Sequence, residues 1–309
     1  MEPSSFDASL AWIRKGSEAP RYAQLVPFSD MSPEELTRFK EVWGGMDAER
    51  QYKLLSRMVA LAEEKVDVNF DRVMELCLSS PDDRLKIKAI EGLWEDREVS
   101  HLSRLMELLR RDSSEEVRAA AAIALGHFAM LAEREELRPA HGEAVSHALL
   151  AAFSDRREHL EVRCRALEAI APMSSPEVVK IIHEAHRSGN GKLKASAIYA
   201  MGQNCDPVWL PLLREELKSP DPEIRFEAAG ACGECGDEEV VPFLVPLLND
   251  SDIQVRLAAI ESLGRIGGTR ARAALRRCSK DEDSDICQAA ADALEEMKAA
   301  EGGFLLDQN

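Results

Sequence analysis

The sequence is poor in aromatic side chains, and this scarcity already favours one fold class. Phe, Trp and Tyr make up 5% of the 309 residues, whereas hydrophobic residues make up 45%. Strands favour aromatic and β-branched side chains, so the composition argues against a sheet-rich protein. Because disordered chains are poor in hydrophobic residues, the same composition predicts a packed core.

Basic side chains are fewer than acidic ones. The chain has 39 Lys and Arg against 56 Asp and Glu, which gives a formal net charge of −17. A nucleic-acid-binding protein usually has a basic face, so this balance argues against nonspecific phosphate binding. No run of about 20 apolar residues is present, which argues against a membrane span. We therefore expect neither nucleic acid nor a membrane as a partner.

The start of the chain and its cysteines bear on the compartment. Residues 1–7 lack the positive segment and the apolar segment of a secretory signal. The seven cysteines are odd in number and scattered, which is not the pattern of a disulfide framework. These features predict a protein of the reducing cytoplasm.

The strongest pattern is an internal repeat with a period of 31 residues. Its template, residues 255–264, reads VRLAAIESLG, and we number these ten positions 1 to 10. Four successive spacings of 31 separate the copies that begin at Val162, Leu193, Ile224, Val255 and Ile286. Two further copies with altered spacing begin at Leu85 and Val117. Seven copies indicate a repeat architecture.

Each copy is predicted to be the second helix, helix B, of a helical hairpin. A polar residue usually stands three positions before the copy, as Asp221 and Asp252 do, where its side chain can cap the first turn. A second apolar segment with an early proline, Pro211 or Pro242, lies between copies and supplies helix A. The glycine at position 10, for example Gly233, suits a helix C-cap. One hairpin cannot bury both of its apolar faces, so neighbouring hairpins are expected to stack.

Position 2 is nearly always basic. We expect this base to reach an acidic cap in an adjacent repeat, with Asp221 and Asp252 as candidate partners. Cys287 replaces the base in the last copy. The predicted ladder consists of Lys86, Arg118, Arg163, Lys194, Arg225 and Arg256.

These residues resemble the HEAT repeat, in the short bacterial variant often described as PBS-lyase HEAT-like. The matching elements are the D-x-x-V-R start and the A-A-x-x-x-L-G finish, clearest in residues 221–233 and 252–264. The resemblance covers roughly residues 70–297 and implies an all-α fold, a right-handed α–α superhelix. Such repeats occur in scaffolds, adaptors, lyases and a few enzymes.

The chain is predicted to have three parts. In the first part, Ser32 and Glu35 form a capping-box pattern before a helix that runs to about Trp43. Residues 1–30 are interpreted as an irregular segment lying on the first helices, with a docking arm as the alternative. The parts are an N-terminal extension and helical cap (1–66), an array of about seven HEAT-like hairpins (67–298) and a flexible C-terminal tail (299–309).

Catalytic and metal-binding patterns are scarce. The sequence has no H-E-x-x-H box, Gly-rich phosphate loop or G-x-S-x-G turn. The HEAT-type metalloenzyme deoxyhypusine hydroxylase uses several His-Glu pairs, whereas this chain has one, His183-Glu184. Cys232 and Cys235 form a C-x-x-C, but structural zinc takes four ligands and only Cys205 is a candidate third. We interpret Cys232 as a core thiol, with a metal or redox role as the alternative, and expect no cofactor.

The expected working surface is the concave side, which B helices line in a solenoid of this kind. Positions 3 and 7 lie four apart on one helix face and should reach solvent there. They form an apolar strip with an acidic border, which suits a basic or amphipathic protein segment. The alternative is that position 3 is half-buried packing. The predicted groove residues are Ile123, Glu168, Tyr199, Phe226, Leu257 and Glu261.

Together these features predict a non-catalytic scaffold or adaptor that binds a protein or peptide along the groove. The alternative function is a bilin-lyase-like enzyme, or its accessory subunit, which the PBS-lyase resemblance implies. Cys164, at position 3 of its copy, is the thiol considered for that role.

Overall fold

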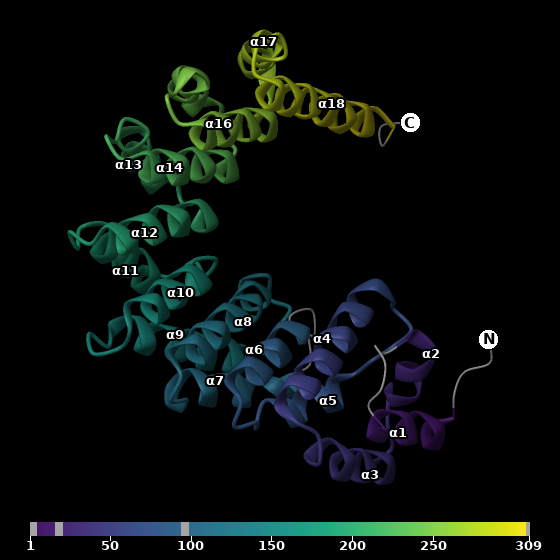
Figure 1. The fold of residues 1–309 in the computed structure, drawn as a ribbon. Helices are drawn as coiled ribbons and strands as arrows, with labels where there is room; N and C mark the ends of the chain where they lie inside the picture. The colour runs from purple at the N-terminus through teal and green to yellow at the C-terminus, as the bar shows by residue number, and fades with distance from the viewer. Residues whose placement is uncertain (1–4, 16–20, 94–98, 307–309) are drawn as a thin grey trace. The chain divides into compact units, whose positions relative to one another are not determined.

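The computed structural model describes residues 5–15, 21–93 and 99–306, and every regular element in them is a helix (Figure 1). This confirms the predicted all-α solenoid. The chain divides into two compact units, residues 1–169 (unit 1) and residues 170–309 (unit 2). Within the described residues, no helix is both long enough and apolar enough to cross a membrane.

Unit 1 begins with a helical cap. Its elements are α1 (Phe6–Lys15), α2 (Tyr22–Leu25), η1 (Val26–Phe28), α3 (Pro33–Gly44) and α4 (Ala48–Glu64). The predicted capping box is present, since the Ser32 amide donates to Glu35 at 2.9 Å and the Ser32 hydroxyl accepts from the Glu35 amide. Helix α1 packs against α3, and Phe28 stacks edge-on against Phe39. In its described part, the N-terminal segment therefore lies on the first helices, but it consists of helices and is not irregular as predicted.

The rest of unit 1 consists of hairpins. Its elements are α5 (Asp71–Cys77), α6 (Asp83–Gly92), η2 (Val99–His101), α7 (Leu102–Arg111), α8 (Glu115–Glu133), α9 (Pro139–Ser154) and α10 (Leu160–Ile170). Helix α5 packs on α6 and α7 on α8, while α4, α6 and α8 follow one another as neighbours. The extra residues between the second and third copies lengthen two helices, because α8 has 19 residues and α9 has 16.

Unit 2 is the more regular of the two. Its A-type segments are α11 (Pro176–His186), η3–α13 (Pro207–Glu216), η4–α15–η5 (Glu238–Asn249) and α17 (Gly268–Cys278). Pro246 cannot donate a backbone hydrogen bond, and the third of these segments continues past α15 as a 3-10 helix. The B helices lie side by side in chain order and are α12 (Gly191–Asn204), α14 (Pro222–Cys235), α16 (Ile253–Ile266) and α18 (Ser284–Leu306) (Figure 1).

The polar residues three positions before the copies cap the B helices, as predicted. The Asp221 carboxylate accepts a hydrogen bond from the Glu223 amide, and the Asp252 carboxylate accepts from the amides of Gln254 and Val255. Asp82, Ser114 and Asn190 cap their helices in the same way. Each cap satisfies an amide that has no partner within its helix.

The glycines at position 10 are not C-caps, which corrects the expectation from sequence. They lie inside the B helices, and the residue after α14 is the left-handed Gly236, with φ of 67°. Each position-10 glycine instead meets the small residue at position 8 of the next B helix. A Cβ on Gly202 would lie 2.6 Å from the Cα of Ala231, so no side chain fits between these backbones. We call this close contact between a position-10 glycine and a position-8 residue a glycine joint. The same contact occurs between Gly126 and Ala169, between Gly233 and Ser262, and between Gly264 and Ala293.

Candidate functional site

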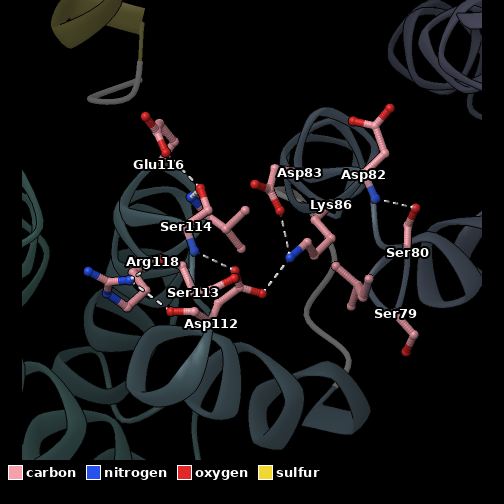
Figure 2. Close-up of polar contacts among 12 residues, drawn as sticks. Ser79, Ser80, Asp82, Asp83, Lys86, Asp112, Ser113, Ser114, Glu116 and Arg118 are labelled. Carbon is pink, nitrogen blue, oxygen red and sulfur yellow. Dashed lines mark hydrogen bonds and ion pairs between the residues drawn. The ribbon is translucent and has the colours of Figure 1, made fainter. Parts of the chain in front are cut away.

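The bases at position 2 form a ladder of ion pairs that links successive repeats. In unit 1, Lys86 Nζ lies 2.6 Å from Asp112 Oδ2 and 2.8 Å from Asp83 Oδ1 (Figure 2). In unit 2, the Arg225 guanidinium donates to both oxygens of Asp250 at 2.7 Å. Three further ion pairs of the ladder join Arg118 to Glu158, Lys194 to Glu216, and Arg256 to Asp281.

The acidic partners are not the caps Asp221 and Asp252, so that prediction is wrong. In three of the five ion pairs the partner stands two residues before the cap: Asp112 precedes Ser114, Asp250 precedes Asp252, and Asp281 precedes Asp283. The physical reason is that the carboxylate of Asp252 is already bound to the first amides of α16. An acid two residues before the cap is the sequence pattern that identifies Asp112, Asp250 and Asp281, whereas Glu158 and Glu216 stand at other distances from the cap.

Arg163 departs from the ladder. Its Nε donates to the backbone carbonyl of Phe153 at 2.8 Å, and its guanidinium lies 5.3 Å from the centre of the Phe153 ring. This base therefore holds the end of its own helix A through a carbonyl and a cation–π contact.

The ladder makes stability depend on pH in the acid range. The hydrogen bond from Arg225 lowers the pKa of the Asp250 carboxyl below its ordinary value. A lowered folded-state pKa contributes stability that is present above the unfolded-state value, about 3.9 for Asp, and is lost as pH falls through the folded-state value. We expect the free energy of unfolding to decline below about pH 4 and the decline to be shallower in Asp250→Asn.

Urea titrations followed by circular dichroism between about pH 7 and pH 3 measure this decline. Asp250→Asn keeps the shape of the side chain and removes its titration. Equal slopes of stability against pH in the two proteins would contradict the prediction.

In unit 2, two aromatic side chains from adjacent B helices reach solvent. Tyr199 on α12 is 43% exposed and Phe226 on α14 is 39% exposed, while Leu257 on α16 is half-buried. Of the three predicted apolar groove residues in unit 2, Tyr199 and Phe226 are therefore exposed and Leu257 is only partly accessible to solvent.

Positions 3 and 7 behave differently along the chain. Position 7 is exposed in most copies, including Glu91, Ile123, Tyr199, Glu261 and Asp292. Position 3 is buried where the side chain is small, as at Ala119, Cys164 and Ala195, and exposed at Phe226. A small side chain does not extend past the neighbouring helices, whereas a phenyl ring does. Both readings of position 3 are therefore correct, each for different copies.

The acidic border in unit 2 contains one cation as well. Glu261 pairs with Arg265 at 2.8 Å, and Arg265 also pairs with Glu234 on α14. Asp292 on α18 accepts a hydrogen bond from Gln288 at 2.7 Å. Three carboxylates against one guanidinium leave the border negative. Glu168 lies in unit 1, where it pairs with Arg165 at 2.6 Å, and Ile123 is 40% exposed on α8 of the same unit.

Cys232, Cys164 and His183 occupy packed positions. Cys232 is fully buried, and burial raises its pKa to about 12. Cys164 is 2% exposed. The His183 ring lies 4.6 Å from the Trp209 ring, and burial lowers the pKa of His183. Among the residues that the structure describes, no group of three or more His, Cys, Asp and Glu side chains is placed to hold a metal ion.

A family model and one solved structure, importin beta, agree with this architecture. The family model for HEAT repeats matches residues 70–144 and 210–295. Importin beta aligns with a TM-score of 0.54 at 14% identity, over 94% of this chain and 44% of its own. The Escherichia coli protein YibA aligns with a TM-score of 0.49 at 17% identity, over 96% of this chain and 98% of its own. Human deoxyhypusine hydroxylase aligns at 0.37 and 18% identity, over 95% of this chain and 97% of its own.

None of the curated proteins matches the chain. At these identities, the likeness to solved structures concerns the fold alone. The family match, by contrast, covers more than half of the residues and falls on the stacked hairpins described above. The chain belongs to the HEAT-repeat family.

Proposed function

We propose that this chain is a non-catalytic protein–protein interaction scaffold, and that a partner segment binds along the B-helix face of unit 2. Membership of the HEAT-repeat family supports a scaffold. One observation carries the binding mode: Tyr199 and Phe226 expose 43% and 39% of their surfaces on neighbouring helices. Exposed aromatic side chains on a fixed framework are typical anchors of protein interfaces.

The two aromatic residues can supply substantial binding free energy. A buried aromatic side chain covers about 200 Å². Burying the exposed two fifths of each ring at about 25 cal/mol per Å² contributes about 2 kcal/mol per residue. The glycine joints and ion pairs already hold α12, α14 and α16 in place. Little ordering entropy of the scaffold therefore opposes binding.

The charges around the strip favour a basic or amphipathic partner. Glu234 lies on the same helix as Phe226, Glu261 and Asp292 lie on the next two B helices, and Arg265 supplies one positive charge against these three carboxylates. The net charge of −17 attracts basic proteins over a longer range. We therefore expect a helical or extended segment with apolar anchors flanked by Lys or Arg.

The state of the reactive groups supports a non-catalytic role. The pKa of the buried Cys232 and Cys77 thiols is raised to about 12, so they are protonated at neutral pH and poor nucleophiles. The ladder bases and acids are engaged in ion pairs between repeats, which is a structural use of charge.

Replacing Tyr199 and Phe226 together by Ser tests the proposal. Partners are captured from native lysate by the wild-type chain and identified by mass spectrometry, and capture by the variant is then compared. We expect partner affinity to fall roughly a thousandfold, because the two lost anchors together contribute about 4 kcal/mol. The helical content measured by circular dichroism should not change, since both side chains are exposed.

The matched control replaces Val208 and Ile253 by Ser. These two apolar side chains of unit 2 are 48% and 39% exposed but lie outside positions 3 and 7. The control should keep its partners. If capture survives in the Tyr199→Ser and Phe226→Ser variant while the fold is intact, the proposed binding face is wrong.

A further inference from the structure

Residues 265–280 carry a concentration of positive charge that the repeat pattern does not require. This stretch contains six basic side chains and no acidic one, in a chain whose net charge is −17. Outside it, 33 basic side chains stand against 56 acidic ones. Four of these bases lie on α17, the A helix of the last repeat, Lys280 lies in the turn that follows it, and Arg265 belongs to the last turn of α16.

On α17 the exposed basic side chains lie away from the packed side. Ala271, Ala274, Leu275 and Cys278 are buried against the neighbouring helices. Arg270, Arg276 and Arg277 are exposed, as is Lys280 after the helix. At 100° per residue the four buried residues span about 100° of the helix circumference, and Arg270, Arg276 and Arg277 lie outside that arc. We call Arg270, Arg276, Arg277 and Lys280 the α17 basic face.

Local electrostatics explain only part of this face. Cations in the last turn of a helix interact favourably with its dipole, which accounts for Arg276 and Arg277. Arg270 lies in the first turn, where the dipole disfavours a cation. Arg265 is engaged with Glu234 and Glu261, whereas among the ion pairs of the described residues none joins the α17 basic face to a carboxylate.

We propose that the α17 basic face binds a short acidic segment of a protein partner, a run of Asp and Glu. Guanidinium groups pair with carboxylates through two parallel hydrogen bonds, so adjacent arginines suit adjacent carboxylates. Helix α17 has 11 residues and is about 16 Å long, which matches an extended segment of about five residues. This second surface prefers an acidic partner, whereas the aromatic strip, Tyr199 and Phe226, prefers a basic one. Binding at the α17 basic face does not depend on binding at the aromatic strip.

The surroundings of α17 favour a short segment over a long polyanion. Glu238 lies beside Gly268 at the start of the helix. Asp281, Glu282, Asp283 and Asp285 follow its end within a few residues. A nucleic acid that continued past either end of α17 would meet these carboxylates, whereas a run of about five acidic residues ends before them.

Fluorescence anisotropy with a labelled hexaglutamate peptide tests the proposal on the full-length chain. In the variant Arg276→Glu with Arg277→Glu, we expect the affinity for this peptide to fall at least about tenfold. The matched control is Arg110→Glu with Arg111→Glu, because that exposed pair also ends an A helix, α7, and changes the net charge by the same amount. The control should change the affinity by less than about twofold.

Other outcomes would overturn the proposal. Equal losses in the two variants would show that net charge alone attracts the peptide, and no loss in the α17 variant would place the binding elsewhere. Tighter binding of a single-stranded oligonucleotide of equal charge would assign the face to nucleic acid. If the Glu variant unfolds, Arg276→Gln with Arg277→Gln takes its place. The Tyr199→Ser and Phe226→Ser variant should bind the peptide normally, which separates this test from that of the aromatic strip.

Discussion

Replacing Asp250 by Ala should lower the free energy of unfolding by about 3 kcal/mol, whereas replacing Asp252 by Ala should lower it by about 1 kcal/mol. The first change leaves the Arg225 guanidinium, whose side chain is 13% exposed, without its bidentate partner. It also removes the acceptor for the Asp252 amide. The second change removes only a helix cap. The two residues differ by two positions, yet they have different structural roles.

Urea unfolding followed by circular dichroism measures both variants. A further variant, Arg225→Leu with Asp250→Leu, should recover most of the loss, because removing both charges leaves no buried ion unpaired. If Asp252→Ala is as damaging as Asp250→Ala, the assignment of the ladder partners is incorrect.

The second large effect concerns two glycines of the same helix. Gly233→Ala should destabilise the protein by about 1–3 kcal/mol, because the added Cβ would lie 2.8 Å from both the Cα and the Cβ of Ser262. These atoms belong to or adjoin the backbone of α16, so α14 and α16 must separate. Separation also weakens the hydrogen bond from the Ser262 hydroxyl to the Ala229 carbonyl, which is 2.8 Å long.

Gly230→Ala provides the control within the same helix. A Cβ at Gly230 meets no atom within 4 Å, and Gly230 lies in the interior of α14. Alanine has a higher helix propensity than glycine, so this variant should be more stable by about 0.5–1 kcal/mol. Thermal unfolding of the two variants should therefore shift in opposite directions. A shift of Gly233→Ala toward higher stability would show that the joint does not constrain the helices.

The 31-residue period of the sequence predicts the fold well, because the same contacts between helices recur in successive repeats. The position of each B helix follows from its apolar anchor and its capping residue, and both are local signals. The roles of Gly202, Gly233 and Gly264 were mistaken, because a glycine near the end of a helical pattern is equally consistent with a C-cap. Only the neighbouring helix shows that these glycines are contact points.

The candidate surface could be predicted in part. Position 7 reaches solvent in most copies, as helical geometry requires. Position 3 could not be assigned from spacing, because its exposure depends on side-chain size: Ala195 is 8% exposed and Phe226 is 39% exposed. The α17 basic face belongs to a stretch, residues 265–280, that has six bases and no acid, but this stretch lies outside the repeated copies, so the period does not point to it.

The joint between position 10 of one B helix and position 8 of the next has an evolutionary consequence. It uses glycine on one side and Ala or Ser on the other, so it does not specify which copy follows. An in-frame duplication of residues 222–252 would bring Gly233 against a second Ala231, the same type of residue that Gly202 already meets. The gene can therefore gain or lose whole modules without inventing a new interface, and the number of repeats is free to vary between descendants.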